Sequence, residues 1–220
     1  ATRTSWRLTC RNLGYQCRIG SSAMLGEATM AVLMFTGNLV FMHYLGDDGV
    51  GAFGIACYYA PFVFMIGNAV AQSAQPIVSF NFGAARFDRV AATQRVALAT
   101  AVFCGAVVAA TFVGAPQALV GLFLPLDNVA AQIAVEGFPL FAAGFVCFVV
   151  NLAVIGYYQS LERVRPATGF ALLRGIIFLV PVFVLLPRLL GTPGIWLAMP
   201  LSETLTLLAI GGYALRKPER

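Results

Sequence analysis

The stretch SSAMLGEATMAVLMFTGNLVFMHYL, residues 21–45, decides the fold class. Its apolar run is interrupted only by Glu27 and His43. A helix needs roughly 20 mainly apolar residues to cross about 30 Å of membrane hydrocarbon. The stretch therefore predicts a membrane-spanning helix that carries a carboxylate. His43, the only histidine, falls near the outer end of this span, where an interfacial role is the simpler interpretation.

The composition of the whole chain agrees with a membrane protein. Of the 220 residues, 60% are hydrophobic and only 10% are charged, and the mean hydropathy is +0.84. A soluble domain usually has about 25% charged residues. These values exclude most soluble enzymes, and in a membrane chain the net charge of +5 does not indicate nucleic-acid binding.

Motifs for catalysis and metal binding are absent from the sequence. There is no nucleophile elbow, Walker loop or dinucleotide fingerprint, so we expect neither an enzyme nor an organic cofactor. The five cysteines have no metal-ligand spacing, and an odd number argues against a disulfide framework. They are Cys10, Cys17, Cys57, Cys104 and Cys147.

Five further apolar segments are long enough to span the membrane, and with the first they predict an all-α membrane protein, a bundle of six transmembrane helices. Pro61 is expected to kink the second span, and Pro76 to end or bend its last turns. The five segments are residues 49–75, 96–115, 137–160, 167–187 and 194–215. Residues 117–134, broken by Pro125 and Asp127, predict a short external helix and a turn.

The basic residues test this count of spans. Thirteen of the fourteen fall on one side of the predicted bundle and only Arg188 on the other, where the loops carry Asp47, Asp48 and Asp127. This asymmetry is the positive-inside pattern, which predicts that both termini are cytoplasmic. The chain lacks an initiator methionine, so we expect residue 1 to be a cut inside a longer protein.

Residues 1–18 differ in character from the six-helix unit of residues 19–220. They are basic, with interleaved apolar residues such as Trp6 and Leu13. That pattern suits a segment on the anionic cytoplasmic leaflet. A disordered linker is an equally good interpretation.

Glu27 is the strongest candidate for a functional residue. An ionisable side chain in a membrane helix costs at least about 2.5–3.5 kcal/mol, so it needs a partner or a function. Asn38 lies on the same helix face, eleven residues later. Such a carboxylate in a wet cavity can bind H⁺, Na⁺ or a cationic ligand. The alternative is an acid that is paired with an arginine or lysine, or permanently protonated.

The other polar residues of the spans have two interpretations each. Arg174 and Glu203 can form a structural pair, or Glu203 can bind a ligand. The remaining amides can form hydrogen bonds between helices or line a cavity. They are Asn68, Gln72 and Gln75, at i, i+4 and i+7 on one helix face, and Asn151 in the fourth span.

Four segments carry a resemblance to a known family. They are GNAVAQSAQPIVSFNFGAARFDR (67–89), YYQSLERVRPAT (157–168), LLRG (172–175) and PGIWLAMPLSETLT (193–206). Together they resemble the second half of transporters of the multidrug and toxic compound extrusion (MATE) family. The resemblance implies one six-helix lobe of a twelve-helix transporter, here the C-terminal lobe, with residues 1–18 ending the inter-lobe linker. Glu27 matches a carboxylate that many members carry in the first helix of this lobe, whereas the fourth-helix acid of one branch is missing.

The resemblance implies an antiporter in a bacterial inner membrane, which exports cationic or amphipathic compounds in exchange for Na⁺ or H⁺. Its partners would be the bilayer, an N-terminal lobe and a small substrate, with a possible Na⁺ at Glu27. One alternative is a lipid-linked oligosaccharide flippase, which needs a strongly cationic cavity, although the spans offer only Arg174. Another is a non-transporting assembly subunit, whose membrane acids would all be paired and which would have no wet cavity.

Overall fold

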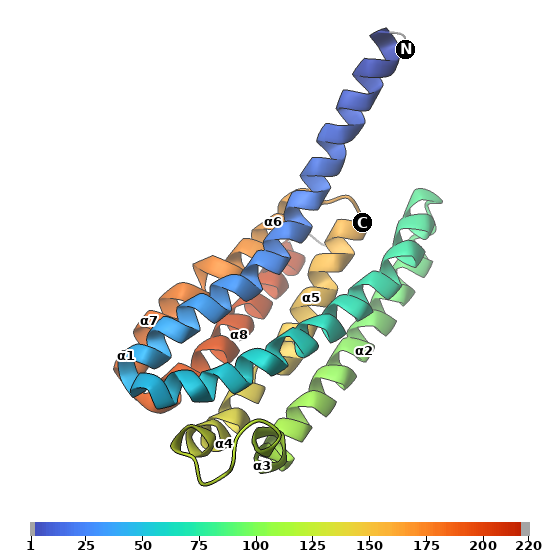
Figure 1. Ribbon diagram of the computed structural model, residues 1–220. Coiled ribbons are helices and arrows are strands. Elements are labelled where there is room, and N and C mark those ends of the chain that lie inside the picture. Colours follow the sequence, from blue (N-terminus) through green and yellow to red (C-terminus); the bar gives the residue numbers. More distant parts are fainter. Residues whose placement is uncertain (1–2, 217–220) are drawn as a thin grey trace.

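The computed structural model describes residues 3–216, apart from the side chains of residues 3–8, 11, 18, 19, 22 and 23. Every element in this range is a helix (Figure 1), which confirms the all-α prediction. The elements are α1 (Arg3–Gly83), α2 (Phe87–Gly114), α3 (Pro116–Gly121), α4 (Val129–Ala142), α5 (Phe145–Ser160), α6 (Val164–Leu172), the π-helical turn η1 (Leu173–Ile177), α7 (Leu179–Leu190) and α8 (Thr192–Arg216).

Helix α1 consists of two legs that meet at Gly46. The backbone at Gly46 has φ 63° and ψ −152°, a conformation that glycine adopts without strain because it lacks a Cβ. The first leg (residues 3–45) and the second leg (47–83) fold back beside each other (Figure 1). The second leg continues through Pro76 to Gly83. Pro76 therefore does not end it, since membrane helices tolerate proline where neighbouring groups compensate the lost hydrogen bond.

Six spans result once this turn is counted. In the described range four helical stretches are long and apolar enough to cross a membrane, and the bent pair α4–α5 forms a fifth. The first stretch, Met24–Gly83, contains both legs of α1 and crosses twice. The structure thus agrees with the predicted six-helix bundle.

The fourth predicted span, residues 137–160, is not one straight helix. It is made of α4 and α5, which meet at a 50° bend. At the bend Gly144 lies directly on α8, where an added Cβ would come within 2.6 Å of the Cα of Pro200. Helix α4 already begins at Val129, where the Asn128 side chain accepts a hydrogen bond from the backbone N–H of Ala130. The predicted external segment 117–134 therefore corresponds to α3, a turn and the first residues of α4.

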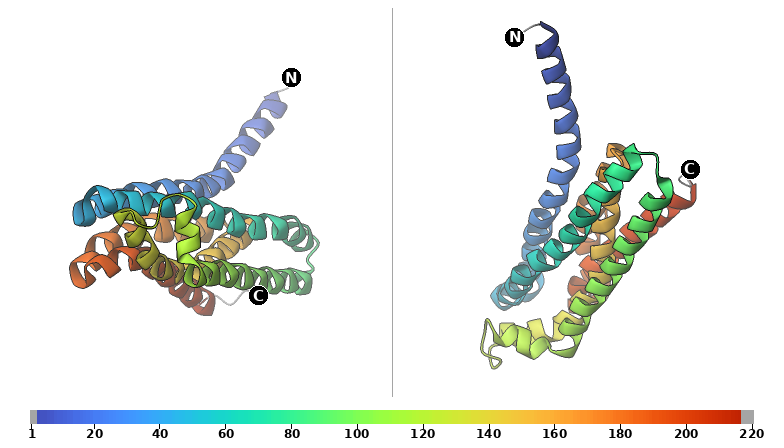
Figure 2. Two further views of the ribbon diagram at one scale, coloured as in Figure 1. Left: turned by 60° about the horizontal axis from the view of Figure 1, so that its bottom comes forward. Right: turned by 90° about the vertical axis from the view of Figure 1, so that its right-hand side faces the viewer.

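Helix α5 forms the centre of the bundle, and twelve of its sixteen residues are buried. It packs against both α1 and α2, and also against α6 and α8. Its contact with α2 is close because Gly105 has no side chain, and an added Cβ there would come within 2.8 Å of the Cα of Val146. Figure 2 shows α2 and the second leg of α1 alongside each other, on the same side of the bundle.

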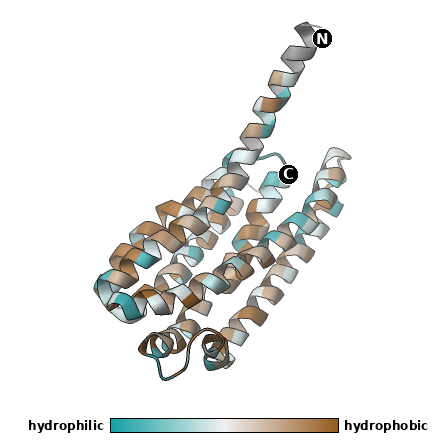
Figure 3. Ribbon diagram, in the orientation of Figure 1, coloured by the Kyte–Doolittle hydropathy of each residue, from teal (hydrophilic) through white to brown (hydrophobic). Residues whose placement is uncertain are grey.

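The two ends of the bundle differ in charge. The basic end holds the turns at 83–87 and 160–164 and the end of α8, with arginines at 86, 89, 163, 165 and 216. The opposite end, here called the Gly46 end, holds Asp47, Asp48 and Asp127. Hydrophilic positions gather toward these ends (Figure 3), and the first leg extends past the basic end (Figures 1 and 2). Residues 3–18 form the beginning of this leg and are helical. Their location on the cytoplasmic membrane surface stays a prediction.

Candidate functional site

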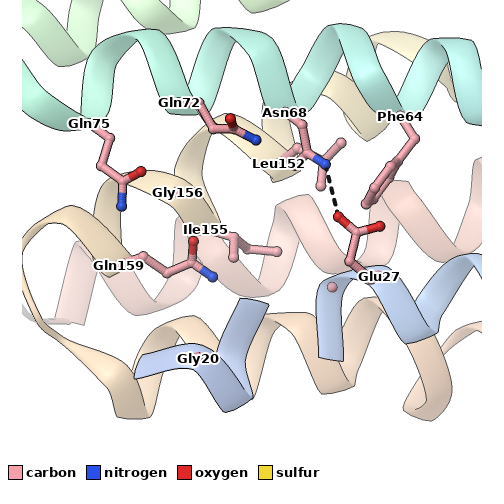
Figure 4. A pocket seen from close by; sticks show the side chains of 12 residues that line it. Gly20, Glu27, Phe64, Asn68, Gln72, Gln75, Leu152, Ile155, Gly156 and Gln159 are labelled. Carbon is pink, nitrogen blue, oxygen red and sulfur yellow. Dashed lines mark hydrogen bonds between the residues drawn. The ribbon is translucent and has the colours of Figure 1, made fainter. Parts of the chain in front are cut away.

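Three amide side chains follow one face of the second leg. Asn68, Gln72 and Gln75 are separated by four and three residues, so the 3.6-residue period of a helix places them on a common stripe. All three line a pocket of about 240 Å³ (Figure 4). Gln72 and Gln75 are exposed to it. The structure therefore supports cavity lining, the second of the two interpretations that the sequence left open.

Glu27 lies across this pocket from the amides. It projects from the first leg, and its Oε1 accepts a hydrogen bond of 3.3 Å from Nδ2 of Asn68 (Figure 4). No arginine or lysine with a described side chain forms an ion pair with Glu27. Among the residues whose side chains the structure describes, its carboxylate is also the only formally charged group that lines the pocket. The pocket is consequently an acidic, amide-lined space.

Helix α5 closes the third side of the pocket with Leu152, Ile155, Gly156 and Gln159. Gly156 lets the second leg approach, because an added Cβ there would be 2.6 Å from the Cβ of Ala71. The contact between α5 and the second leg is therefore tight. The open space lies toward the first leg, where Glu27 is located.

The donor set of the pocket suits a hard monovalent cation. Carboxylate and amide oxygens are ligands for hard cations, and a carboxylate also binds a proton. Groups of three or more His, Cys, Asp or Glu side chains that could hold a metal ion do not occur among the described residues. A single carboxylate surrounded by neutral amides fits weak, exchangeable binding better than a permanent metal centre.

A second charged centre lies in the core, between α5, η1 and α8. Nε of Arg174 is 2.7 Å from Oε1 of Glu203, and the two side chains are 1% and 2% exposed. Asn151 donates from Nδ2 to Oε2 of Glu203 at 2.8 Å and to its backbone carbonyl at 2.9 Å. The guanidinium carbon of Arg174 is 4.1 Å from the ring centroid of Phe148. Arg174 and Glu203 thus form the structural pair that the sequence allowed.

Three predicted site residues do not line the pocket. Asn151 and Glu203 belong to the core pair, where Asn151 and Nε of Arg174 each donate a hydrogen bond to the carboxylate of Glu203. Asn38 is exposed on the first leg, eleven residues beyond Glu27. Eleven residues correspond to about 16 Å along a helix, too far to share one site of this size.

Several residues of the pocket were missed in the sequence. Gln159 is a polar residue in the last turn of a span, a position that the sequence alone does not distinguish from a helix end. Phe64 resembles any other apolar residue, although it borders the pocket next to Asn68 (Figure 4). Gly20 and Gly26 also line the pocket and gave no signal.

Comparison with known proteins identifies the family. The MatE family model matches residues 23–185, well over half of the chain. A search of curated protein sequences gives no match. The chain resembles the solved structure of the MATE multidrug transporter DinF-BH in complex with a ligand, with 26% identity and a TM-score of 0.78 over 93% of this chain and 46% of that one.

Two other solved structures share the fold at lower identity. A mutant of the Vibrio cholerae MATE transporter VcmN is 16% identical, with a TM-score of 0.82 over 96% of this chain and 48% of that one. MATE in a bent conformation is 14% identical, with a TM-score of 0.82 over 93% and 45%. The chain spans just under half the length of these structures. It belongs to the MatE family of multi-pass membrane transporters, and its six spans have the fold of one half of such a transporter.

Proposed function

We propose that the chain is the C-terminal lobe of an antiporter that exports cationic or amphipathic compounds in exchange for Na⁺ or H⁺. It lies in a bacterial inner membrane with both termini in the cytoplasm, and an N-terminal six-helix lobe completes the transport path. The observation that carries this proposal is the Glu27 carboxylate, which borders an amide-lined pocket and forms no ion pair with the described arginines and lysines. A carboxylate of this kind can bind Na⁺ or H⁺ and a cationic compound in turn, which is the basis of exchange.

The substrate class follows from the same pocket. Its single negative charge attracts cations, and the aromatic ring of Phe64 offers an apolar surface beside the carboxylate. This combination suits an organic cation with an apolar body. The likeness to DinF-BH, a multidrug transporter, supports the same class.

The two alternative functions have less support. A flippase for lipid-linked oligosaccharides needs a cationic cavity for its pyrophosphate, but Arg174 is buried against Glu203 and does not line the pocket. A non-transporting assembly subunit would have all its membrane acids paired. Glu203 fits that description and Glu27 does not.

The substitution Glu27→Gln in the full-length reading frame tests the proposal. It keeps the shape of the side chain and its ability to accept from Asn68, and removes the charge. We expect unchanged expression and melting temperature, loss of gradient-driven efflux from vesicles, and at least about tenfold weaker cation binding, equivalent to about 1.4 kcal/mol.

Glu136→Gln is the matched control, because Glu136 is exposed on α4 and lies outside the pocket. It makes the same chemical change and should leave efflux and cation binding intact. Efflux by Glu27→Gln at the rate of the unmodified protein would remove Glu27 from the coupling mechanism. A loss of folded protein would instead indicate a structural acid.

A further inference from the structure

The pocket at Glu27 is elongated toward the basic end of the bundle. Gly20 lies seven residues before Glu27 on the first leg, and Gln75 lies seven residues after Asn68 on the second leg. Seven helical residues correspond to about 10 Å. Because the two legs are antiparallel, both displacements point toward the same end. Figure 4 shows Gly20, Gln75 and Gln159 at the side of the pocket away from Glu27.

The wall of this elongated space carries neutral polar groups. Asn68 hydrogen-bonds Glu27, and Gln72 and Gln75 continue the same face toward the basic end. Gln72 and Gln75 are exposed, and neither forms a hydrogen bond to another described side chain of the bundle. Amides with unused donors and acceptors hold water in a membrane-embedded space, since leaving them dry would be costly.

Packed aromatic rings border the end of the pocket at which Glu27 lies. Phe64 lines the pocket on one side and is 5% exposed, and its ring centroid lies 6.3 Å from that of Phe148. Behind the rings is Arg174, whose guanidinium carbon is 6.0 Å from the Phe64 centroid. An aromatic layer in front of a buried arginine opposes the passage of a cation. The open length of the pocket therefore runs from Glu27 toward the basic end.

We propose that Asn68, Gln72, Gln75 and Gln159 line a hydrated path by which the coupling cation moves between Glu27 and the basic end. The inference rests on the proposed function of Glu27. It adds the route by which a cation passes between Glu27 and the basic end of the bundle. Asn68 belongs to the cation-binding site itself, because it contacts the carboxylate of Glu27. Gln72 and Gln75 act on the rate of exchange, since they lie along the path and do not contact Glu27.

Cysteine accessibility in the full-length protein tests the path. In a background without the native cysteines, Gln72→Cys and Gln75→Cys are treated with a membrane-impermeant cationic methanethiosulfonate, added separately to each side of sealed vesicles. Ser73→Cys is the matched control, because Ser73 lies between the two glutamines and lines the apolar groove against α2. A thiol in apolar surroundings is protonated and unreactive, so we expect both glutamine positions to react at least about tenfold faster than position 73.

The side of the reaction decides the direction of the path. Labelling of positions 72 and 75 from the side of the basic end supports the proposal. Labelling confined to the side of the Gly46 end, labelling no faster than at position 73, or no labelling at all would overturn it.

Gln75→Leu separates the path from the binding site itself. We expect it to slow cation exchange several-fold at unchanged equilibrium affinity, whereas Asn68→Leu lowers the affinity. Weaker equilibrium binding in Gln75→Leu would contradict the path. If instead Glu27→Gln binds the cation normally while positions 72 and 75 still label from the basic end, the proposed function fails and the hydrated cavity stands.

Discussion

Replacing Glu203 by glutamine would leave Arg174 without a counter-charge in the core of the bundle. The pair is almost completely buried, with 1% and 2% exposure, and its N–O distance is 2.7 Å. The glutamine introduced at position 203 could still accept the hydrogen bond from Asn151, and its amide NH2 would then face Nε of Arg174, so the substitution removes both the charge and the acceptor that Arg174 uses. The stability of the bundle should therefore report the ion pair itself.

The expected magnitude follows from this burial. Removing one partner of a buried pair typically costs about 3–5 kcal/mol, because the remaining charge stays unpaired. In a unit of about 150–250 residues, 1 kcal/mol corresponds to about 2–4 °C, so we expect the unfolding temperature of this 220-residue lobe to fall by about 6–20 °C. Arg174→Met should cost a similar amount, because it leaves the carboxylate of Glu203 with Asn151 alone.

The double variant Arg174→Met with Glu203→Gln provides the decisive comparison. It leaves no buried charge, and such neutral replacements are often tolerated. Thermal unfolding of the purified full-length protein in detergent should show the double variant melting well above either single variant. If the losses of the two single variants simply add, the two side chains are not coupled and the reasoning is refuted.

Two further predictions concern the packing and the orientation of the bundle. Gly105→Val should lower the melting temperature clearly more than Gly114→Val, because a Cβ at Gly105 meets the backbone of Val146 while nothing lies within 4 Å of one at Gly114; equal losses would mean that α2 and α5 do not pack closely there. In intact cells an impermeant thiol reagent should label cysteine at Asp47, and should label cysteine at Arg89 only after permeabilisation; the reverse pattern would contradict the cytoplasmic termini.

Much of the fold could be predicted from the sequence because the membrane restricts it. Each span must satisfy its own backbone hydrogen bonds as a helix, so a run of about 20 apolar residues leaves few other choices. The turn at Gly46 agrees with the short connection, residues 46–48, between the first two predicted spans. The bend at Gly144 could not be predicted, because it depends on the contact with Pro200, which is distant in sequence.

The candidate site was predictable only in part. Asn68, Gln72 and Gln75 share a face by helix period alone, and the cost of an acid in a membrane helix singles out Glu27. Asn38 lies on the same face of the first leg as Glu27. Eleven residues of helix nevertheless separate the two side chains, and the pocket does not extend to Asn38. Periodicity gives the direction of a side chain and not which neighbouring helix it meets, so Gln159 was not found.

Glu27 and Glu203 differ in whether their carboxylates are paired with an arginine. Each is a single carboxylate in an apolar helix, and the sequence gives both the same cost. Arg174 contacts Glu203 from η1, and the Phe64 ring lies between this arginine and the pocket. A π-helical turn contains one residue more than an α-helical turn, which changes the direction of the side chains that follow by about 100°. Arg174 lies within this turn and is bound to Glu203, so it is not available as a partner for Glu27, which accepts a hydrogen bond from Asn68 instead.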